Sequence, residues 1–246
     1  FPNYKQNPNI MNIVKTKRLN NIQFYPKVNE KKQIFLHHTA GLSADSAIAW
    51  WNQTPEHVGT AYVIERDGTI YEVFPPECWG YHIGMKGDDD FVEKNSIGIE
   101  LVSAGGLVKE GEKFIFYPLY PNKIKGFAIK PEDVVELENE WKGFKYFHKY
   151  SSAQITAVCE LIADLTKRFK IPIQDNYEKF FEYNLDVMRK HMPGIWSHST
   201  LITYKADIIP YPEFLKALND TFKSLKGLGS ADKPKEVPKI ADPIPN

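Results

Sequence analysis

Cysteine is scarce in this sequence, and this limits the kinds of site that the chain can form. Only Cys78 and Cys159 occur in 246 residues, and neither belongs to a CxxC pair. A zinc site built on paired cysteines is therefore not expected. Cys159 falls on the apolar side of a predicted helix, so we expect two buried thiols.

Net charge and long apolar runs are also missing. The 31 lysines and arginines balance 31 aspartates and glutamates, so nothing indicates binding to nucleic acid, which needs a basic surface. No run reaches the roughly 18 apolar residues that mark a membrane-spanning helix. The first residues, FPNYKQNPNIMNIVK, lack the apolar core and cleavage site of a secretory signal. A start at Phe rather than Met also fits a chain that has been processed.

The remaining composition is typical of a globular domain with additions. Apolar residues make up 42% of the chain, which is enough for a sizeable core. We expect the polar residues 1–30 to form an N-terminal arm, residues 31–225 to form one domain, and the Pro-rich residues 226–246 to form a tail or linker. Residues from about 104 to 149 are rich in Lys, Glu and aromatic side chains, and they predict an ordered insertion because disordered segments contain few aromatics.

Hydrophobic periodicity predicts an α/β fold with a central mixed β-sheet flanked by helices. Apolar runs at 33–38 and 95–102 predict buried strands, and Asp67-Gly68 between two β-rich segments predicts a hairpin. Helices are expected after a cap at Ser43 or Asp45, and in three later segments at 151–170, 176–190 and 211–225.

Three segments carry side chains that are suited to chemistry. IFLHHTAG ends a predicted strand with His37 and His38, which point to opposite faces if the strand continues. Glu100 lies within NSIGIELV, where a carboxylate either faces solvent or belongs to a site with a raised pKa. In SHSTLITYKAD, His198 is followed by Lys205 and Asp207. Each segment, taken singly, also has a simpler explanation. The histidines fit surface residues at a strand end, Glu100 fits a strand with one solvated face, and the segment from His198 to Asp207 fits an ordinary loop.

Together, these side-chain types form a complete set for metal-assisted amide hydrolysis. Two histidines and a carboxylate give Zn²⁺ three ligands and leave the fourth position open for water, whose pKa the metal lowers toward about 7. A glutamate that does not bind the metal can take the proton and pass it to a leaving amine. A lysine can stabilise the tetrahedral oxyanion. The combination therefore favours a hydrolase with an open metal site.

The sequence also resembles a known family. In order, it contains IFLHHTAG, AYVIERDGTIYEVF, NSIGIELV and SHSTLITYKAD, which are similar to motifs of the zinc-dependent N-acetylmuramoyl-L-alanine amidases. This is the family of phage lysozyme-type amidases and peptidoglycan recognition proteins, and the resemblance covers roughly residues 33–103 and 150–220. It implies a mixed sheet flanked by helices, with zinc at one end of a groove.

The resemblance also implies roles for individual residues. It assigns the three metal ligands to His37, His198 and Asp207. It assigns the general base to Glu100 and the oxyanion-stabilising lysine to Lys205. CWGYHIG resembles a segment that lines the substrate groove, which implies that Trp79 and His82 lie near the substrate. His38 is then a structural neighbour of the metal site.

Some features depart from the family pattern. The Asp-Pro-Gly that usually follows the lysine is replaced by Asp207-Ile-Ile-Pro, and the spacing from His198 to Asp207 differs from that of several members. A tyrosine that is common in the family aligns with Thr60, so a mechanism that uses it is not available. The N-terminal arm and residues 104–149 have no counterpart in the minimal fold.

The function implied by the resemblance is hydrolysis of the amide between N-acetylmuramic acid and L-alanine, in peptidoglycan or a muropeptide, by metal-activated water. A peptidoglycan-binding module without catalysis is one alternative, although the ligand positions are intact. The other is a phage or secretion-apparatus component that uses the fold as a scaffold and binds a protein partner through the insertion or tail. We expect action on the bacterial cell wall, as for a phage endolysin or a delivered toxin, and cytoplasmic recycling also fits.

Overall fold

The centre of the molecule is a mixed β-sheet of six strands in the order β1-β4-β3-β5-β2-β11. The computed structural model describes residues 11–85, 90–118 and 121–231. Only β3 and β4 pair antiparallel in this sheet, and the other neighbours pair parallel. The strands span Ile13–Val14 (β1), Gln33–His38 (β2), Tyr62–Ile64 (β3), Ile70–Glu72 (β4), Ser96–Leu101 (β5) and Gly194–Ser197 (β11).

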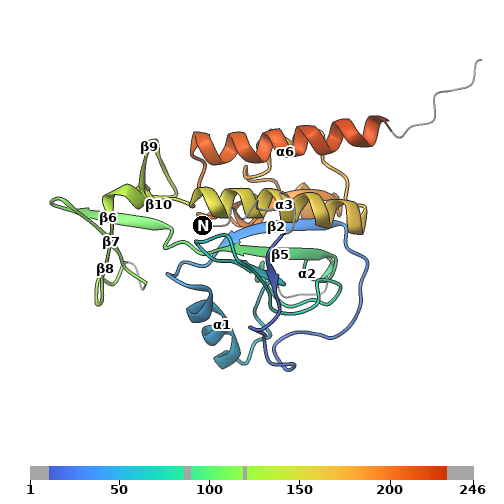
Figure 1. Ribbon diagram of the computed structural model, residues 1–246, viewed down its shortest axis with the longest axis horizontal. Coiled ribbons are helices and arrows are strands. Elements are labelled where there is room, and N and C mark those ends of the chain that lie inside the picture. Colours follow the sequence, from blue (N-terminus) through green and yellow to red (C-terminus); the bar gives the residue numbers. More distant parts are fainter. Residues whose placement is uncertain (1–10, 86–89, 119–120, 232–246) are drawn as a thin grey trace, which may run out of the picture.

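Helices cover both faces of this sheet (Figure 1). On one face lie α3 (Ser152–Phe169) and α6 (Pro212–Ala231), which pack side by side, and α1 (Ala44–Gln53) lies on the other. The prediction of a mixed sheet flanked by helices is therefore confirmed. The short helices are α2 (Phe91–Lys94), α4 (Asp186–Arg189) and α5 (His198–Leu201), with single 3₁₀ turns at Pro131–Asp133 and Tyr177–Lys179. No helix among the described residues combines the length and apolar character that a membrane span requires.

Strand β2 has apolar residues on both faces because both faces are covered. Ile34 and Leu36 belong to the main core together with residues of α3 and α6, whereas Phe35 packs in a second cluster with Trp196. All six residues of β2 are buried, as is usual for a strand in the middle of a parallel region. The strand therefore leads the chain through the interior to His37 and His38 at its end.

The insertion forms a second sheet, which extends from the side of the main body (Figure 1). Its five antiparallel strands have the order β8-β7-β6-β10-β9. They span Gly106–Glu110 (β6), Lys113–Phe116 (β7), Phe127–Ile129 (β8), Val134–Trp141 (β9) and Phe144–His148 (β10). Arg66, in the predicted hairpin turn, ties this sheet to the body by donating to the Lys149 carbonyl at 2.8 Å and to Asp133 at 2.9 Å.

The prediction of a helix over residues 176–190 is wrong. This segment contains only the 3₁₀ turn Tyr177–Lys179 and the short α4. The Phe180 carbonyl accepts from the backbone of Ser197 and the hydroxyl of Thr200, and the Phe181 carbonyl accepts from Ser199. These carbonyls are therefore used in a long-range contact, and no continuous helix can form through them.

The two ends of the described chain also differ in detail from the sequence-based outline. Within the predicted N-terminal arm, β1 joins the edge of the central sheet beside β4, and Leu19 and Phe24 are buried. Helix α6 continues beyond residue 225 to Ala231. Residues 1–10 of the arm and 232–246 of the predicted tail lie outside the described residues.

Candidate active site

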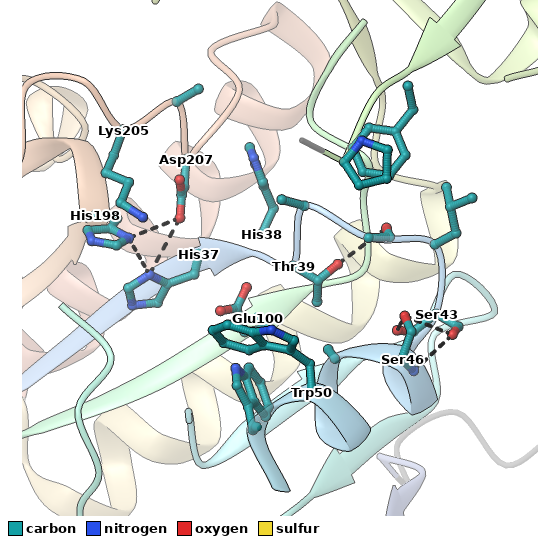
Figure 2. Close-up of a pocket in the computed structure, with 18 of the residues that line it drawn as sticks. His37, His38, Thr39, Ser43, Ser46, Trp50, Glu100, His198, Lys205 and Asp207 are labelled. Carbon is teal, nitrogen blue, oxygen red and sulfur yellow. Dashed lines mark hydrogen bonds and ion pairs between the residues drawn. The ribbon is translucent and has the colours of Figure 1, made fainter. Parts of the chain in front are cut away.

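Three side chains that could hold a metal ion meet at the carboxyl end of the central sheet. His37 is near the end of β2, and His198 directly follows the neighbouring parallel strand β11. Asp207 comes from the loop before α6, which is held in place by a bond from the Ser199 N–H to the Asp207 carbonyl at 3.1 Å. All three side chains are buried (Figure 2). The sequence reasoning grouped these residues, and the structure brings them together.

The three facing atoms form a nearly regular triangle. The Nδ1 atoms of His37 and His198 are 3.0 Å apart, and Asp207 Oδ2 is 3.2 Å from His198 Nδ1 and 3.5 Å from His37 Nδ1. Zinc at about 2.0–2.1 Å from tetrahedral ligands holds these ligands about 3.3 Å apart. Two imidazoles and a carboxylate at this spacing are a donor set that fits zinc.

The charges in this cluster are strongly perturbed. Burial, opposed in part by the nearby Asp207 carboxylate, lowers the pKa of His37 to about 4, so this ring is neutral at neutral pH. Burial alone would raise the pKa of Asp207, but His38, His198 and His37 outweigh it and hold that pKa well below its usual range. Asp207 is therefore a carboxylate that faces the neutral ring of His37.

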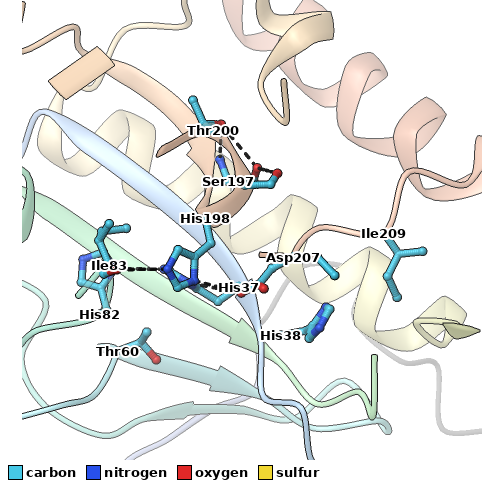
Figure 3. A network of polar contacts seen from close by, with 12 residues as sticks. His37, His38, Thr60, His82, Ile83, Ser197, His198, Thr200, Asp207 and Ile209 are labelled. Carbon is cyan, nitrogen blue, oxygen red and sulfur yellow. Dashed lines mark hydrogen bonds and ion pairs between the residues drawn. The ribbon is translucent and has the colours of Figure 1, made fainter. Parts of the chain in front are cut away.

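Each histidine of the cluster has a partner on its outer nitrogen (Figure 3). His37 Nε2 lies 2.9 Å from His82 Nδ1, and His198 Nε2 lies 3.1 Å from the Ile83 carbonyl oxygen. His38 is not part of the triangle, and its Nδ1 lies 3.2 Å from the Tyr150 hydroxyl. The adjacent histidines thus have different positions, as the alternation along a strand predicts.

Glu100 lies beside the triangle, on β5, where it pairs with His37 of β2 in the sheet register. Its Oε2 is buried and has no hydrogen-bond partner within the described ranges. Burial raises the pKa of Glu100 well above its usual value, Asp207 raises it further, and Lys205 opposes this shift. Glu100 therefore presents one buried carboxyl oxygen without a hydrogen-bond partner in the described part of the chain, next to the triangle.

A cavity of about 920 Å³ opens in front of these residues (Figure 2). His37, Glu100, His198, Lys205 and Asp207 all line it. Much of the remaining wall comes from the loop at 39–43, helix α1, the insertion and the segment before Asp207. It includes Trp50, Tyr204, Phe116, Pro118 and Phe127. The Trp50 side chain is 61% exposed and that of Tyr204 is 77% exposed, so two aromatic side chains of the wall are open to solvent.

The two residues predicted to lie near the substrate have different positions. His82 lines the cavity and also contacts His37. Trp79 does not line this cavity, and its buried indole stacks on Tyr25 of the N-terminal segment, with ring centroids 4.0 Å apart. A substrate contact of His82 stays a prediction. A substrate contact of Trp79 also stays a prediction.

Sequence reasoning missed several residues that shape this site. The Ile83 carbonyl is a backbone group and has no sequence signature. Phe116 and Phe127 belong to an insertion that was predicted to be ordered but whose distance from the cavity could not be derived. Glu93, the acidic residue within FVEK, has no motif around it that indicates a role. Its position just before an apolar strand is the one sequence signal that points to its burial.

The solved structures that resemble the chain include the catalytic domain of XlyA, with 16% identity, 88% of this chain and 99% of that chain covered, and a TM-score of 0.44. They also include the N-acetylmuramyl-L-alanine amidase AmiD from E. coli in complex with an anhydro-muropeptide substrate. It has 19% identity, 78% of this chain and 59% of that chain covered, and a TM-score of 0.48. A third is the hydrolase AmiA from Staphylococcus aureus, with 12% identity, 90% of this chain and 86% of that chain covered, and a TM-score of 0.47.

The comparison with sequence families is more decisive. No curated protein matches the sequence. The family model of N-acetylmuramoyl-L-alanine amidase matches residues 27–211, well over half of the chain, and this range contains the whole metal cluster and Glu100. The chain therefore belongs to the N-acetylmuramoyl-L-alanine amidase family.

Proposed function

We propose that this protein is a zinc-dependent amidase that hydrolyses the bond between N-acetylmuramic acid and L-alanine in peptidoglycan. The family supports the reaction type. One observation carries the rest of the proposal: His37, His198 and Asp207 direct three donor atoms to one point, beside Glu100 and at the wall of a large cavity. Three protein ligands leave one position of a tetrahedral metal open, which is the arrangement of catalytic zinc sites.

The protein's own groups have separate roles in this reaction. Bound zinc would supply a Lewis acid that polarises the scissile carbonyl and lowers the pKa of water. Glu100 takes a proton from the attacking water and returns it to the leaving amine of L-alanine. Lys205 lines the same cavity, where its positive charge stabilises the oxyanion that develops in the transition state. Asp207 and both histidines stay in place as ligands throughout.

The remaining wall of the cavity suits a long substrate. Phe116 and Phe127 of the insertion face the same cavity as the cluster, and the solvent-exposed rings of Trp50 and Tyr204 also line it. Such rings offer apolar faces to sugar rings and to the apolar atoms of a peptide stem. We therefore propose that the protein acts on the bacterial cell wall or on fragments of it.

The test is a digest of purified peptidoglycan with and without a zinc chelator, analysed by mass spectrometry. We expect stem peptides with a free L-alanine amine, and their loss on chelation with recovery on added zinc. Glu100→Gln is the control, because it leaves the three ligands untouched. If the protein binds zinc and the wall but releases no peptide, the reaction proposed here is refuted and a binding module takes its place.

A further inference from the structure

The loop at residues 82–85 contacts both histidines of the metal cluster from the outside (Figure 3). His82 Nδ1 lies 2.9 Å from His37 Nε2, and the carbonyl of the next residue, Ile83, lies 3.1 Å from His198 Nε2. The histidines themselves come from strands β2 and β11, which are far apart in sequence. One short loop therefore holds the outer side of both rings.

Glu93 holds this loop in its conformation. Its carboxylate accepts from four consecutive backbone N–H groups, those of His82 at 2.9 Å, Ile83 at 3.2 Å, Gly84 at 2.9 Å and Met85 at 3.1 Å. Glu93 is 1% exposed, so these bonds form away from competing water. Hydrogen bonds to an ionised acceptor are about twice as strong as neutral ones. The position of His82 and of the Ile83 carbonyl thus depends on one buried carboxylate.

A chain of hydrogen bonds fixes which nitrogen of His37 carries the proton. The Ser96 hydroxyl donates to the Val92 carbonyl, which can only accept. With its single proton used there, Ser96 Oγ accepts from His82 Nε2 at 2.7 Å. The neutral His82 ring then has a bare Nδ1, which accepts from His37 Nε2–H. The Nδ1 atom of His37 is therefore left without a proton, and it faces the cluster.

The same rule applies to His198. Its Nε2 faces the Ile83 carbonyl, which is an acceptor only, so this nitrogen carries a proton and Nδ1 is the atom that faces the cluster. The Nδ1 atoms of the two rings, 3.0 Å apart, then face each other and the carboxylate of Asp207. A metal that binds at this point displaces any proton that these three atoms share. The loop thus prepares both rings to bind a metal through Nδ1.

We propose that Glu93 and Ser96 are positioning residues that fix the Nε2–H tautomer of the two histidines and thereby set the affinity of the site for zinc. The inference rests on the metal site of the proposed function. Groups that orient the ligands of a metal from outside typically change its affinity by about 10–100-fold when they are removed. Ser96 acts on His37 alone through His82, whereas Glu93 acts on both histidines through the loop.

The test reads tautomers and zinc affinity independently of catalysis. In zinc-free protein, long-range ¹H–¹⁵N NMR identifies the protonated nitrogen of each ring, and competition with a chromophoric chelator gives the zinc dissociation constant. We expect Nε2–H for both rings in the wild type. Ser96→Ala should mix the tautomers of His37, leave those of His198 unchanged, and weaken zinc binding about 10–100-fold. Ser96→Thr, which keeps the hydroxyl, should restore both readouts.

A matched control separates this effect from general loss of packing. Ser103→Ala also removes a buried hydroxyl that donates to a carbonyl, that of His148 at 2.6 Å, but it touches neither histidine of the cluster. We expect unchanged zinc affinity in this variant. Glu93→Gln should alter the tautomers of both rings. If this variant does not fold, the tautomers and zinc affinity of Ser96→Ala alone test the inference.

The outcomes distinguish this inference from the proposed function. A wild-type His37 protonated on Nδ1, or a Ser96→Ala protein with unchanged tautomers and zinc affinity, overturns the inference even if the protein cleaves peptidoglycan. Conversely, the expected tautomers and the expected loss of zinc affinity support it even if the wild type releases no stem peptide, in which case only the proposed reaction fails.

Discussion

Acid should destabilise the protein through His148, which lies where the insertion sheet joins the body. The side chain is buried, and its Nδ1 accepts from the Ala104 N–H at 3.1 Å. The backbone carbonyl of His148 accepts from the Ser103 hydroxyl at 2.6 Å, and the backbone N–H of His148 donates to the Gly105 carbonyl at 2.9 Å. Burial, with a further contribution from the positive charge of Arg66, lowers the pKa of His148 to about 4.

The sign and size of the effect follow from linkage. An unfolded histidine has a pKa of about 6.5, so as the pH falls the unfolded chain binds the proton before the folded one does. The contribution of His148 to stability is therefore complete above pH 6.5 and is lost as the pH falls toward 4. Between pH 7 and pH 5 the loss is about 2 kcal/mol, and the full loss is about 3 kcal/mol.

Urea unfolding at pH 7, 6 and 5 measures this loss, with chelator present throughout so that metal binding does not contribute. The control is His148→Asn, whose side-chain oxygen can accept from the Ala104 N–H but cannot be protonated in this range. We expect the unfolding free energy of the wild type to fall by about 2 kcal/mol more than that of the variant from pH 7 to pH 5. Equal pH dependence in the two proteins would refute the reasoning.

Three further predictions concern the candidate site. Glu100→Gln should keep its zinc and lose about 10²–10⁴-fold in turnover, and equal activity would remove Glu100 as the base. His198→Ala should lower both the zinc content and the thermal midpoint, because metal binding stabilises the folded state; unchanged metal stoichiometry would reject it as a ligand. Trp50→Ala should raise KM for muropeptides with little change in kcat, because the exposed ring lies on the cavity wall; an unchanged KM would exclude it from substrate binding.

Local patterns were sufficient for the elements that support the site. Strand β2 has apolar residues on both faces, and β5 has Ile97, Ile99 and Leu101 on one face. Helix α3 has an apolar stripe behind a capping box in which Ser151 and Gln154 bond to each other's backbone. In each case the signal lies within the segment itself. The three candidate ligands could be grouped for a related reason, because side chains that can bind metals are few and their order along the chain resembles a family pattern.

Long-range contacts account for what could not be derived. The segment 176–190 lacks Gly and Pro and was therefore predicted to be helical, yet the carbonyls of Phe180 and Phe181 bond to the segment that carries His198. Likewise, the aromatic residues of the insertion predict order but not a partner, and only the three-dimensional arrangement brings Phe116 and Phe127 to the cavity. Such contacts are set by distant parts of the chain that have no fixed spacing in sequence.

The proposed metal site shows what a sequence cannot tell about metal ligands, namely which nitrogen of each histidine ring can bind the metal. His37 and His198 can be identified as candidate ligands by their residue type, but a ring binds a metal only through a nitrogen that carries no proton. Which nitrogen that is depends on the Ile83 carbonyl and on the Ser96 hydroxyl acting through His82. It follows that two chains with the same three ligands need not have the same zinc affinity, and that the loop which contacts the outer nitrogens decides the difference.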